Sequence, residues 1–290
     1  MARGRHASKG SGCLSRLITF ALLIALIGYP FYEARHLTQD EKTLVIQGLP
    51  ADFNNLRIVY LSDIHMGPMY SLSRVKSLVQ QINALGADIV LLGGDYANDS
   101  AGAIRFFKDA PPLRARLLVA GVLGNHDRTV PESNLNLLQN AMIGAGVWPL
   151  VNNVKSVKIG SSTLTLAGID DVNNGHPDIE GVARMVGTDD FVIFLSHSPA
   201  ALPAANKATD RDGRPRWFDL ALCGHTHGGQ ITFFGQPLIP EFQKVERRYL
   251  SGWIEENRVP ILISNGVGTA YVPIRLFAPA QIHVITLKSK

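Results

Sequence analysis

Apolar positions in residues 43–290 are concentrated in short runs, and five of these runs end in polar residues. They are LRIVYLSD (56–63), ADIVLLGGD (87–95), RLLVAGVLGNHD (116–127), FVIFLSH (191–197) and FDLALCGH (218–225). Because each run is apolar at consecutive positions, both faces of each strand are expected to be buried. Helical patterns separate the runs, which is typical of a layered α/β sheet with crossover helices.

Other segments predict a helix, a hairpin and further strands. SLSRVKSLVQQINALG (71–86) repeats apolar residues at helical spacing, and Gly86 provides the stop signal. KSVKIGSSTLTLAGID (155–170) predicts a β-hairpin that turns at residues 160–162. The last third predicts strands in ITFFG (231–235), RYLSGWIEE (248–256), VPILISN (259–265) and AQIHVITL (280–287). With no linker or repeat inside residues 43–290, we expect one domain of two sheets with helices outside.

An uncharged run, LITFALLIALIGYPFY (17–32), precedes this domain and follows a basic N-terminal arm. A membrane span needs about 20 apolar residues, so we expect a transmembrane anchor at 14–32 after a cytoplasmic arm at 1–13. A cleaved signal peptide is the alternative, because its basic and apolar regions look the same. No pair of small residues follows at the right offset, which favours the uncleaved anchor. An amphipathic helix lying on the inner face is disfavoured, because the run has no polar side.

Charge bias then predicts a single-pass protein of the bacterial inner membrane, with its N terminus in the cytoplasm and its folded domain outside. The lipid bilayer is therefore one expected partner. The net charge of +4 lies largely in the first sixteen residues, and without a basic stripe in the folded part we expect no nucleic-acid partner. The two cysteines, Cys13 and Cys223, are too few for a disulfide scaffold, and Cys223 is expected in the core. The sequence gives no signal for the oligomeric state.

Residues that can bind metal stand at the end of every buried run. In chain order they are Asp63 and His65, Asp95, Asn125 and His126, His197, and His225 and His227. Ligand sites of open α/β sheets lie beyond the carboxyl ends of the strands, so these residues are expected to share one rim.

Each motif taken alone also has a structural explanation. SDIHMG and GGD fit ordinary turns, GNHD fits a solvated loop, and His197 fits a satisfied core histidine. The strongest single motif is GHTH, because imidazoles two residues apart lie on one side of an extended segment. The occurrence of all five motifs at successive strand ends favours one metal site over five unrelated explanations.

The ordered set SDIHMG, GGDYAND, GNHD, LSHSPA and GHTHGGQ resembles the calcineurin-like metallophosphoesterases from about Leu56 to Ile282. With its anchor, GGDY and GHTHGGQ, the chain looks most like the membrane-anchored bacterial branch, which includes UDP-2,3-diacylglucosamine pyrophosphatases and other cell-envelope phosphodiesterases. PAQI (279–282) departs from the PEI of that branch, with Gln281 at the acidic position. The resemblance implies an α/β fold: a four-layer α/β/β/α sandwich of two mixed sheets with its metal site at the C-terminal rim of the strands.

The resemblance also implies two divalent metal ions bridged by Asp95. One ion would be held by Asp63, His65, Asp95 and His227, and the other by Asp95, Asn125, His197 and His225. Mixed carboxylate, amide and imidazole donors suit manganese (Mn2+), iron (Fe2+) or zinc (Zn2+). A site of this kind attracts a phosphate ester, and the expected reaction is attack of metal-bound hydroxide on phosphorus.

His126 lies outside this ligand set, so we expect it to protonate the leaving group, with Asp127 orienting its imidazole. Gly228 and Gly229 are expected to let the backbone approach the metals. Arg128 and Arg275 are left open between phosphate contacts and surface charges.

Other functional classes fit less well. The HxHxDH pattern of metallo-β-lactamases and the HExxH helix of zinc proteases are absent from the sequence. A non-catalytic metal-binding scaffold with the same fold remains the alternative, although such proteins usually lose ligands that are all present here. The expected function is hydrolysis of a phosphodiester or pyrophosphate bond in a cell-envelope or lipid-linked substrate such as UDP-2,3-diacylglucosamine.

Overall fold

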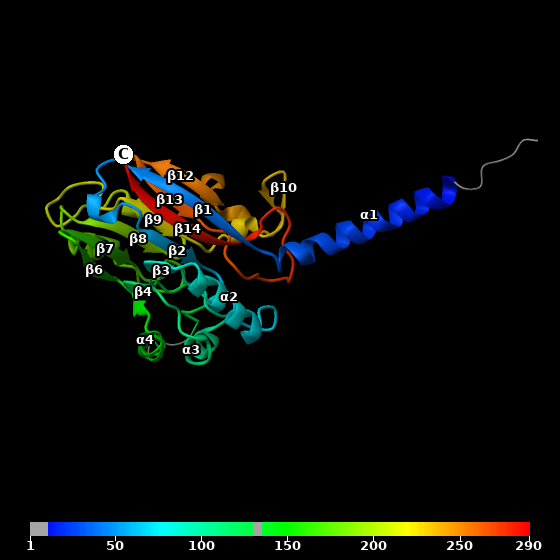
Figure 1. The fold of residues 1–290 in the computed structure, drawn as a ribbon, viewed down its shortest axis with the longest axis horizontal. Coiled ribbons are helices and arrows are strands. Elements are labelled where there is room, and N and C mark those ends of the chain that lie inside the picture. Colours follow the sequence, from blue (N-terminus) through cyan, green and yellow to red (C-terminus); the bar gives the residue numbers. More distant parts are fainter. Residues whose placement is uncertain (1–10, 130–134) are drawn as a thin grey trace, which may run out of the picture.

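Two six-stranded mixed sheets lie face to face in the computed structural model, which describes residues 11–129 and 135–290 (Figure 1). The first sheet has the order β1 (Leu37–Ile46), β14 (Ala280–Ser289), β2 (Arg57–Leu61), β3 (Ile89–Leu92), β4 (Leu118–Gly121), β5 (Trp148–Pro149). The second has the order β12 (Gly252–Glu256), β13 (Val259–Ile263), β9 (Leu220–Cys223), β8 (Phe191–Ser196), β7 (Ser162–Gly168), β6 (Asn153–Ile159). Strands β2 to β5 are parallel, as are β7, β8, β9 and β13.

Helices cover the outer face of each sheet. The first sheet carries α2 (Leu72–Ala84), α3 (Ser100–Asp109) and α4 (Leu135–Gly144), and the second carries α5 (Ile179–Arg184) and α6 (Leu202–Ala205). Short 3-10 turns occupy Ala51–Phe53, Pro199–Ala201, His227–Gly229, Phe242–Lys244 and Arg247–Tyr249. The predicted α/β/β/α order of layers is confirmed.

Alternation along the strands builds the core. In β2, Ile58 and Tyr60 pack against the second sheet, while Val59 and Leu61 pack under the helices. Burial on both faces explains why the run is apolar at consecutive positions. Cys223, in β9, is fully buried beneath α5 and α6, as predicted.

The predicted helix and hairpin are both present. Helix α2 begins after Ser71, whose Oγ accepts from the backbone N–H of Arg74 at 3.4 Å, and it buries its apolar stripe at Val75, Leu78, Val79 and Ile82. Strands β6 and β7 pair in register across the turn at Gly160.

Two C-terminal strands are shorter than predicted. The ITFFG segment contributes only β10 (Thr232–Phe233), which pairs with β11 (Gln236–Pro237), because Phe234 and Gly235 take positive φ and turn the chain back. Residues 247–249 form a 3-10 turn, so the strand expected from residue 248 begins at Gly252.

The first sheet extends before residue 43, the expected beginning of the domain. Strand β1 begins at Leu37 and pairs in parallel with β14 along its whole length. It is an edge strand in which only Leu44 and Ile46 are buried, so its LTQDEK half lacks an apolar pattern.

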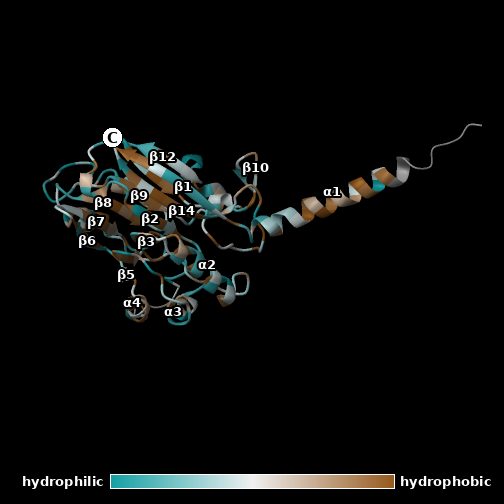
Figure 2. Cartoon of the chain, in the orientation of Figure 1, coloured by the Kyte–Doolittle hydropathy of each residue, from teal (hydrophilic) through white to brown (hydrophobic). Residues whose placement is uncertain are grey.

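A long helix, α1 (Ser11–Glu33), leaves the domain beside β10 (Figure 1). Its segment Leu14–Glu33 is long and apolar enough to cross a membrane, and the 18-residue apolar stretch within it is not buried against the domain. Figure 2 shows it as a largely brown, hydrophobic rod. The basic arm expected at residues 1–13 lies, up to residue 10, outside the described residues.

Candidate metal centre

The carboxyl ends of five strands bring all the predicted site residues to one rim. Asp63 and His65 follow β2, Asp95 follows β3, Asn125, His126 and Asp127 follow β4, His197 follows β8, and His225 and His227 follow β9. Five of these residues have φ between 51° and 70°, a left-handed conformation that side chains other than glycine rarely adopt: Asp63, His65, Asp95, His225 and His227. Such strain clusters at functional sites, where surrounding structure enforces it.

One group of donors forms around Asp63, His65 and His227. The Nε2 atoms of His65 and His227 lie 3.1 Å apart, and His227 Nε2 is 3.5 Å from Asp63 Oδ1. His65 Nε2 is also 3.5 Å from Asp95 Oδ2. All three residues are buried, and their donor atoms lie within 4.8 Å of one another.

A second group forms around His197. Its Nε2 lies 3.3 Å from Asp95 Oδ2, 3.2 Å from Asn125 Oδ1 and 3.2 Å from His225 Nδ1. Its Nδ1 donates to the Gly93 carbonyl at 2.7 Å, which fixes the ring and directs Nε2 into the cluster. Asp95 therefore touches both groups.

Burial and nearby charges keep most of these imidazoles neutral. Burial lowers the pKa of His65, lowers that of His225 to about 3, and lowers that of His227 well below its ordinary value. Burial would also lower the pKa of His197, but the Asp95 carboxylate raises it well above its ordinary value. Neutral imidazoles are the form that coordinates metal.

His126 occupies a third position at the same rim. Its ring lies edge-on to His65, with centroids 4.9 Å apart, and it is only partly buried. Its Nδ1 donates to the Asn98 carbonyl at 3.0 Å, since a carbonyl can only accept. Its donor atom also groups with those of His65 and Asp95, within 4.8 Å.

Asp127 does not orient the His126 imidazole, contrary to our expectation. Its carboxylate is buried and accepts three backbone N–H groups: from Asp95 at 2.7 Å, Gly124 at 2.9 Å and Tyr96 at 3.1 Å. These groups converge behind the metal-binding face, so Asp127 holds two rim loops together while Asn98 fixes the histidine. Adjacency in sequence could not reveal this difference.

Two buried polar residues that the sequence analysis did not assign brace the loop after β9. Arg275, which is fully buried, donates to the carbonyls of His227 (3.2 Å), Asn265 (2.7 Å), Gly268 (2.6 Å) and Ala278 (2.8 Å). Arg275 is therefore neither a surface charge nor a group free to contact phosphate. Gln230, the last residue of GHTHGGQ, binds the backbone of residues 270, 272 and 274 through its amide.

A further loop supports Asn125. Asp171 accepts from the backbone N–H groups of Asn173 and Asn174, and the Asn174 side chain donates to the Asn125 carbonyl at 2.9 Å. Arg128 pairs with the buried Asp170 of this loop at 3.1 Å, with its own side chain 6% exposed. The sequence signal is DVNN (171–174), which directly follows the predicted hairpin.

Gly228 lies where the backbone turns and packs closely against Asn265. It sits at φ 61°, and a Cβ there would collide with the side chain of Asn265. A side chain at this position would displace the loop that carries His225 and His227.

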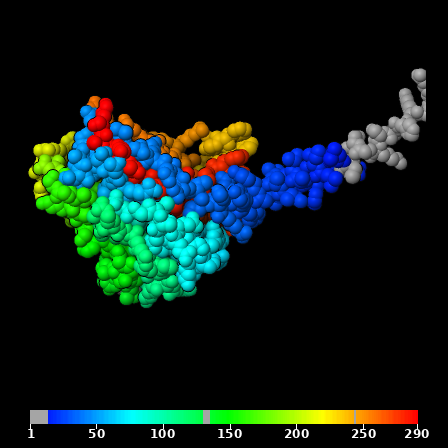
Figure 3. All heavy atoms as spheres, viewed as in Figure 1, coloured from blue at the N-terminus to red at the C-terminus, as the bar shows by residue number. Residues whose placement is uncertain are grey.

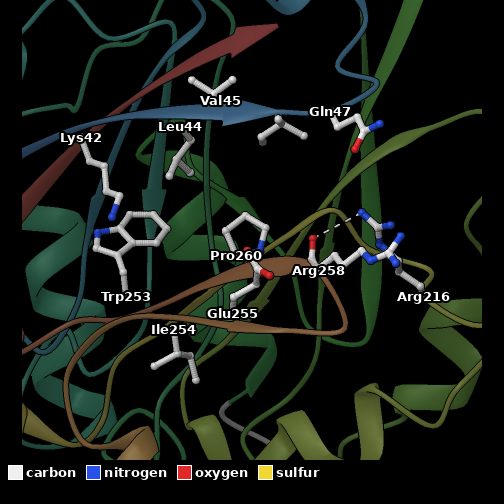
Figure 4. A pocket seen from close by; sticks show the side chains of 11 residues that line it. Lys42, Leu44, Val45, Gln47, Arg216, Trp253, Ile254, Glu255, Arg258 and Pro260 are labelled. Carbon is white, nitrogen blue, oxygen red and sulfur yellow. Dashed lines mark hydrogen bonds between the residues drawn. The ribbon is translucent and has the colours of Figure 1, made fainter. Parts of the chain in front are cut away.

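A separate hollow of about 720 Å³ lies between the edge strands β1 and β12 (Figure 4). Lys42 lies over the ring of Trp253, at 4.9 Å from the centroid, and Arg216 and Arg258 line the same hollow. None of the predicted site residues lines it, so it is not part of the metal centre.

This chain is similar to some proteins of about its own length and to others that are longer. The chain is 29% identical over 270 residues to the uncharacterized metallophosphoesterase YkuE of Bacillus subtilis (strain 168), covering 90% of each. It is 31% identical over 260 residues to the transmembrane protein with metallophosphoesterase domain of Bos taurus, covering 84% of this chain and 55% of that protein. Among solved structures, NAD nucleotidase (NadN) of Haemophilus influenzae aligns with a TM-score of 0.47 and 14% identity, over 73% of this chain and 45% of that one.

The family model for calcineurin-like phosphoesterases matches residues 56–229, which include every predicted site residue. Relatives named metallophosphoesterases and a rim of clustered metal-binding side chains agree with this match. The chain belongs to the calcineurin-like phosphoesterase family.

Proposed function

We propose that this chain is a membrane-anchored hydrolase that uses two divalent cations to cleave a phosphodiester or pyrophosphate bond. The observation that supports it most is the convergence of seven donor side chains on one buried rim, with Asp95 shared between two groups. A lipid-linked or cell-envelope substrate, such as UDP-2,3-diacylglucosamine, fits the apolar helix that precedes the domain.

The donor set fits two cations. Asp63, His65 and His227 would hold one and Asn125, His197 and His225 the other, with Asp95 between them. The raised pKa of His197 is a consequence of its closeness to Asp95, and a cation between the two would take the place of that proton. Hard oxygen donors mixed with imidazoles suit manganese, iron or zinc.

Cations bound in such a pair lower the pKa of a shared water and neutralise phosphate oxygens. The chain itself would supply the proton for the leaving group. Because His126 Nδ1 is committed to the Asn98 carbonyl, its Nε2 is the atom that would carry that proton. Its partial exposure leaves it accessible to a substrate at the rim.

Two substitutions at the rim test this assignment. Asp95→Asn should lose bound metal, measured by elemental analysis of the purified full chain, and with it all turnover of bis(p-nitrophenyl) phosphate. His126→Ala should keep its metal but lose about a hundredfold in turnover of an alkyl phosphodiester, whose leaving group needs a proton. The p-nitrophenyl substrate, whose leaving group does not, should be affected less.

His176→Ala is the matched control, because His176 is exposed and its side chain belongs to none of the donor groups. It should leave both metal content and turnover unchanged. Two ions retained in Asp95→Asn would contradict the bridging position. Full turnover of the alkyl substrate by His126→Ala would remove His126 from the reaction, and loss of metal in that variant would make it a ligand instead.

A further inference from the structure

Exposed apolar side chains gather beside the end of α1. Outside α1, the described residues include eleven exposed large apolar side chains. Six of them lie in two neighbouring segments, 231–238 and 269–277. We name them the apolar collar: Phe233, Phe234, Leu238, Tyr271, Val272 and Phe277, with Phe234 84% exposed. Figure 3 shows the first segment in gold and the second in orange-red, both at the end of the domain from which α1 leaves. An apolar surface of this kind marks an interaction site.

Hydrogen bonds tie the collar to the end of α1. The backbone N–H of Arg275 donates to the Pro30 carbonyl at 3.0 Å, and the Glu33 carboxylate accepts from the N–H groups of Phe277 and Ala278 at 3.1 and 3.0 Å. Glu33 is itself buried. If α1 spans a bilayer, these bonds hold residues 275–278 at the depth where the helix emerges.

The residues around that exit are of the types that lie at membrane interfaces. Tyr29 and Tyr32 are exposed on the last turns of α1, with ring centroids 6.4 Å apart. Aromatic side chains of this kind concentrate at the headgroup level.

Positive charge follows directly after the helix. A cavity of about 260 Å³ is lined by Arg35, Arg74 and Tyr70 among others, and its described lining residues include no carboxylate. The Arg74 guanidinium lies 4.0 Å from the Tyr70 ring centroid and donates to the Ala34 carbonyl at 3.3 Å. Basic groups at this level attract anionic headgroups.

The collar is also contiguous with the metal centre. The ring of Phe242 lies between His227, at 5.7 Å, and Tyr271, at 6.0 Å. Gln230 joins the metal-bearing loop to residues 270–274 through four hydrogen bonds. Helix exit, collar and metal loop are therefore parts of one hydrogen-bonded unit.

We propose that the apolar collar is a second membrane contact, which enters the headgroup region of the bilayer that α1 crosses. An apolar face of this kind lies about 5–10 Å into the boundary between headgroups and acyl chains. The contact would hold the domain against the membrane in one orientation, with the rim of the metal centre beside the lipid surface. It does not depend on the proposed hydrolysis.

Fluorescence quenching in the membrane tests this contact. The full chain, with Cys13→Ser so that only the buried Cys223 remains, receives an environment-sensitive dye at Leu238→Cys. It is reconstituted into vesicles of phosphatidylcholine and phosphatidylglycerol that contain lipids with nitroxides near the headgroup. Leu137→Cys is the matched control, because Leu137 in α4 is also leucine and both side chains are 56% exposed.

The dye at residue 238 should be quenched at least about twofold more than the dye at residue 137, as expected for insertion to this depth. Adding Phe234→Asp should reduce quenching at residue 238 to the level of the control, without changing the control itself. Phe234 is so exposed that this charge will not disturb folding.

Equal quenching at both positions would overturn the proposal, and so would an emission shift at residue 238 that depends on protein concentration, since that would place a second copy on the collar. The measurement involves no turnover. Failure of the proposed hydrolase activity would therefore leave this result unaffected, and the reverse also holds.

Discussion

The loops after β4 and β9 both carry metal-binding side chains, but the buried side chains that hold them differ: one accepts hydrogen bonds from the backbone and the other donates them. Behind the first, N–H groups of Asp95, Tyr96 and Gly124 converge on the Asp127 carboxylate. Behind the second, several carbonyls converge on the Arg275 guanidinium. A buried polar group is tolerated where the backbone groups that point at it have the complementary polarity. These two loops are therefore fixed from behind by an acceptor or by a donor, according to which end of the peptide group faces inward.

The largest expected effect is at the cationic brace. Arg275→Met should lower the free energy of unfolding by at least about 3 kcal/mol, because several buried carbonyls lose their donors at once. Urea unfolding of the full chain in detergent measures it. The stability of Arg275→Lys should lie between that of Arg275→Met and that of the native chain. Arg105→Met is the control: its side chain is 72% exposed, and the change should alter stability by less than about 0.5 kcal/mol. A stable Arg275→Met variant would show that the carbonyls find other donors.

The brace at Asp127 should be somewhat less costly to break. Asp127→Asn should lose about 2 kcal/mol, because its amide can turn an oxygen toward Asp95 and Gly124 but then presents an N–H group to that of Tyr96. The same urea unfolding measures this loss. Asp109→Asn, on the exposed face of α3, is the control. If both variants unfolded alike, the three N–H groups would not depend on the carboxylate.

The smallest effect concerns protons at the loop after β9. Burial holds the pKa of His225 at about 3, so below pH 6.5 the unfolded chain binds a proton that the folded chain refuses. This contribution destabilises the metal-free protein as pH falls from 6.5 toward 3. Between pH 7.5 and 5.5 in EDTA, the free energy of unfolding of the native protein should fall by about 1 kcal/mol more than that of His225→Gln. Thermal unfolding at the two pH values measures the difference.

His176→Gln, at an exposed histidine, should follow the native pH dependence in the same experiment. Equal losses in the native protein and in His225→Gln would mean that His225 already accepts a proton when folded. Burial in the loop after β9 would then have no effect on the protonation of His225.

The fold was largely predictable because its central strands are buried on both faces. Runs such as 89–92 and 191–195 are apolar throughout, and no other secondary structure of that length explains them as well. Strand β1 could not be predicted, because pairing with β14, rather than an apolar pattern, holds its polar half in the sheet.

The metal-binding residues were predictable as a set, whereas the hydrogen bonds by which neighbouring residues hold them in place were not. Metal-binding side chains are rare enough at strand ends for their order to be informative. The partners of Asp127 depend on where the loops after β3 and β4 meet. Arg275 reaches His227 because a loop some fifty residues later in the chain folds back against it. Such contacts depend on convergence in space, which local sequence does not encode.

The bonds between Glu33 and residues 277 and 278 have a practical consequence for studies of this enzyme without most of α1. A truncated chain that began at Ala34 would strip two inward-pointing N–H groups of their acceptor and would free the Arg275 N–H from Pro30. Cleavage before Tyr29 would keep all of these bonds while still removing most of the apolar helix. The last turn of α1 should therefore be kept with the folded domain in expression and crystallisation.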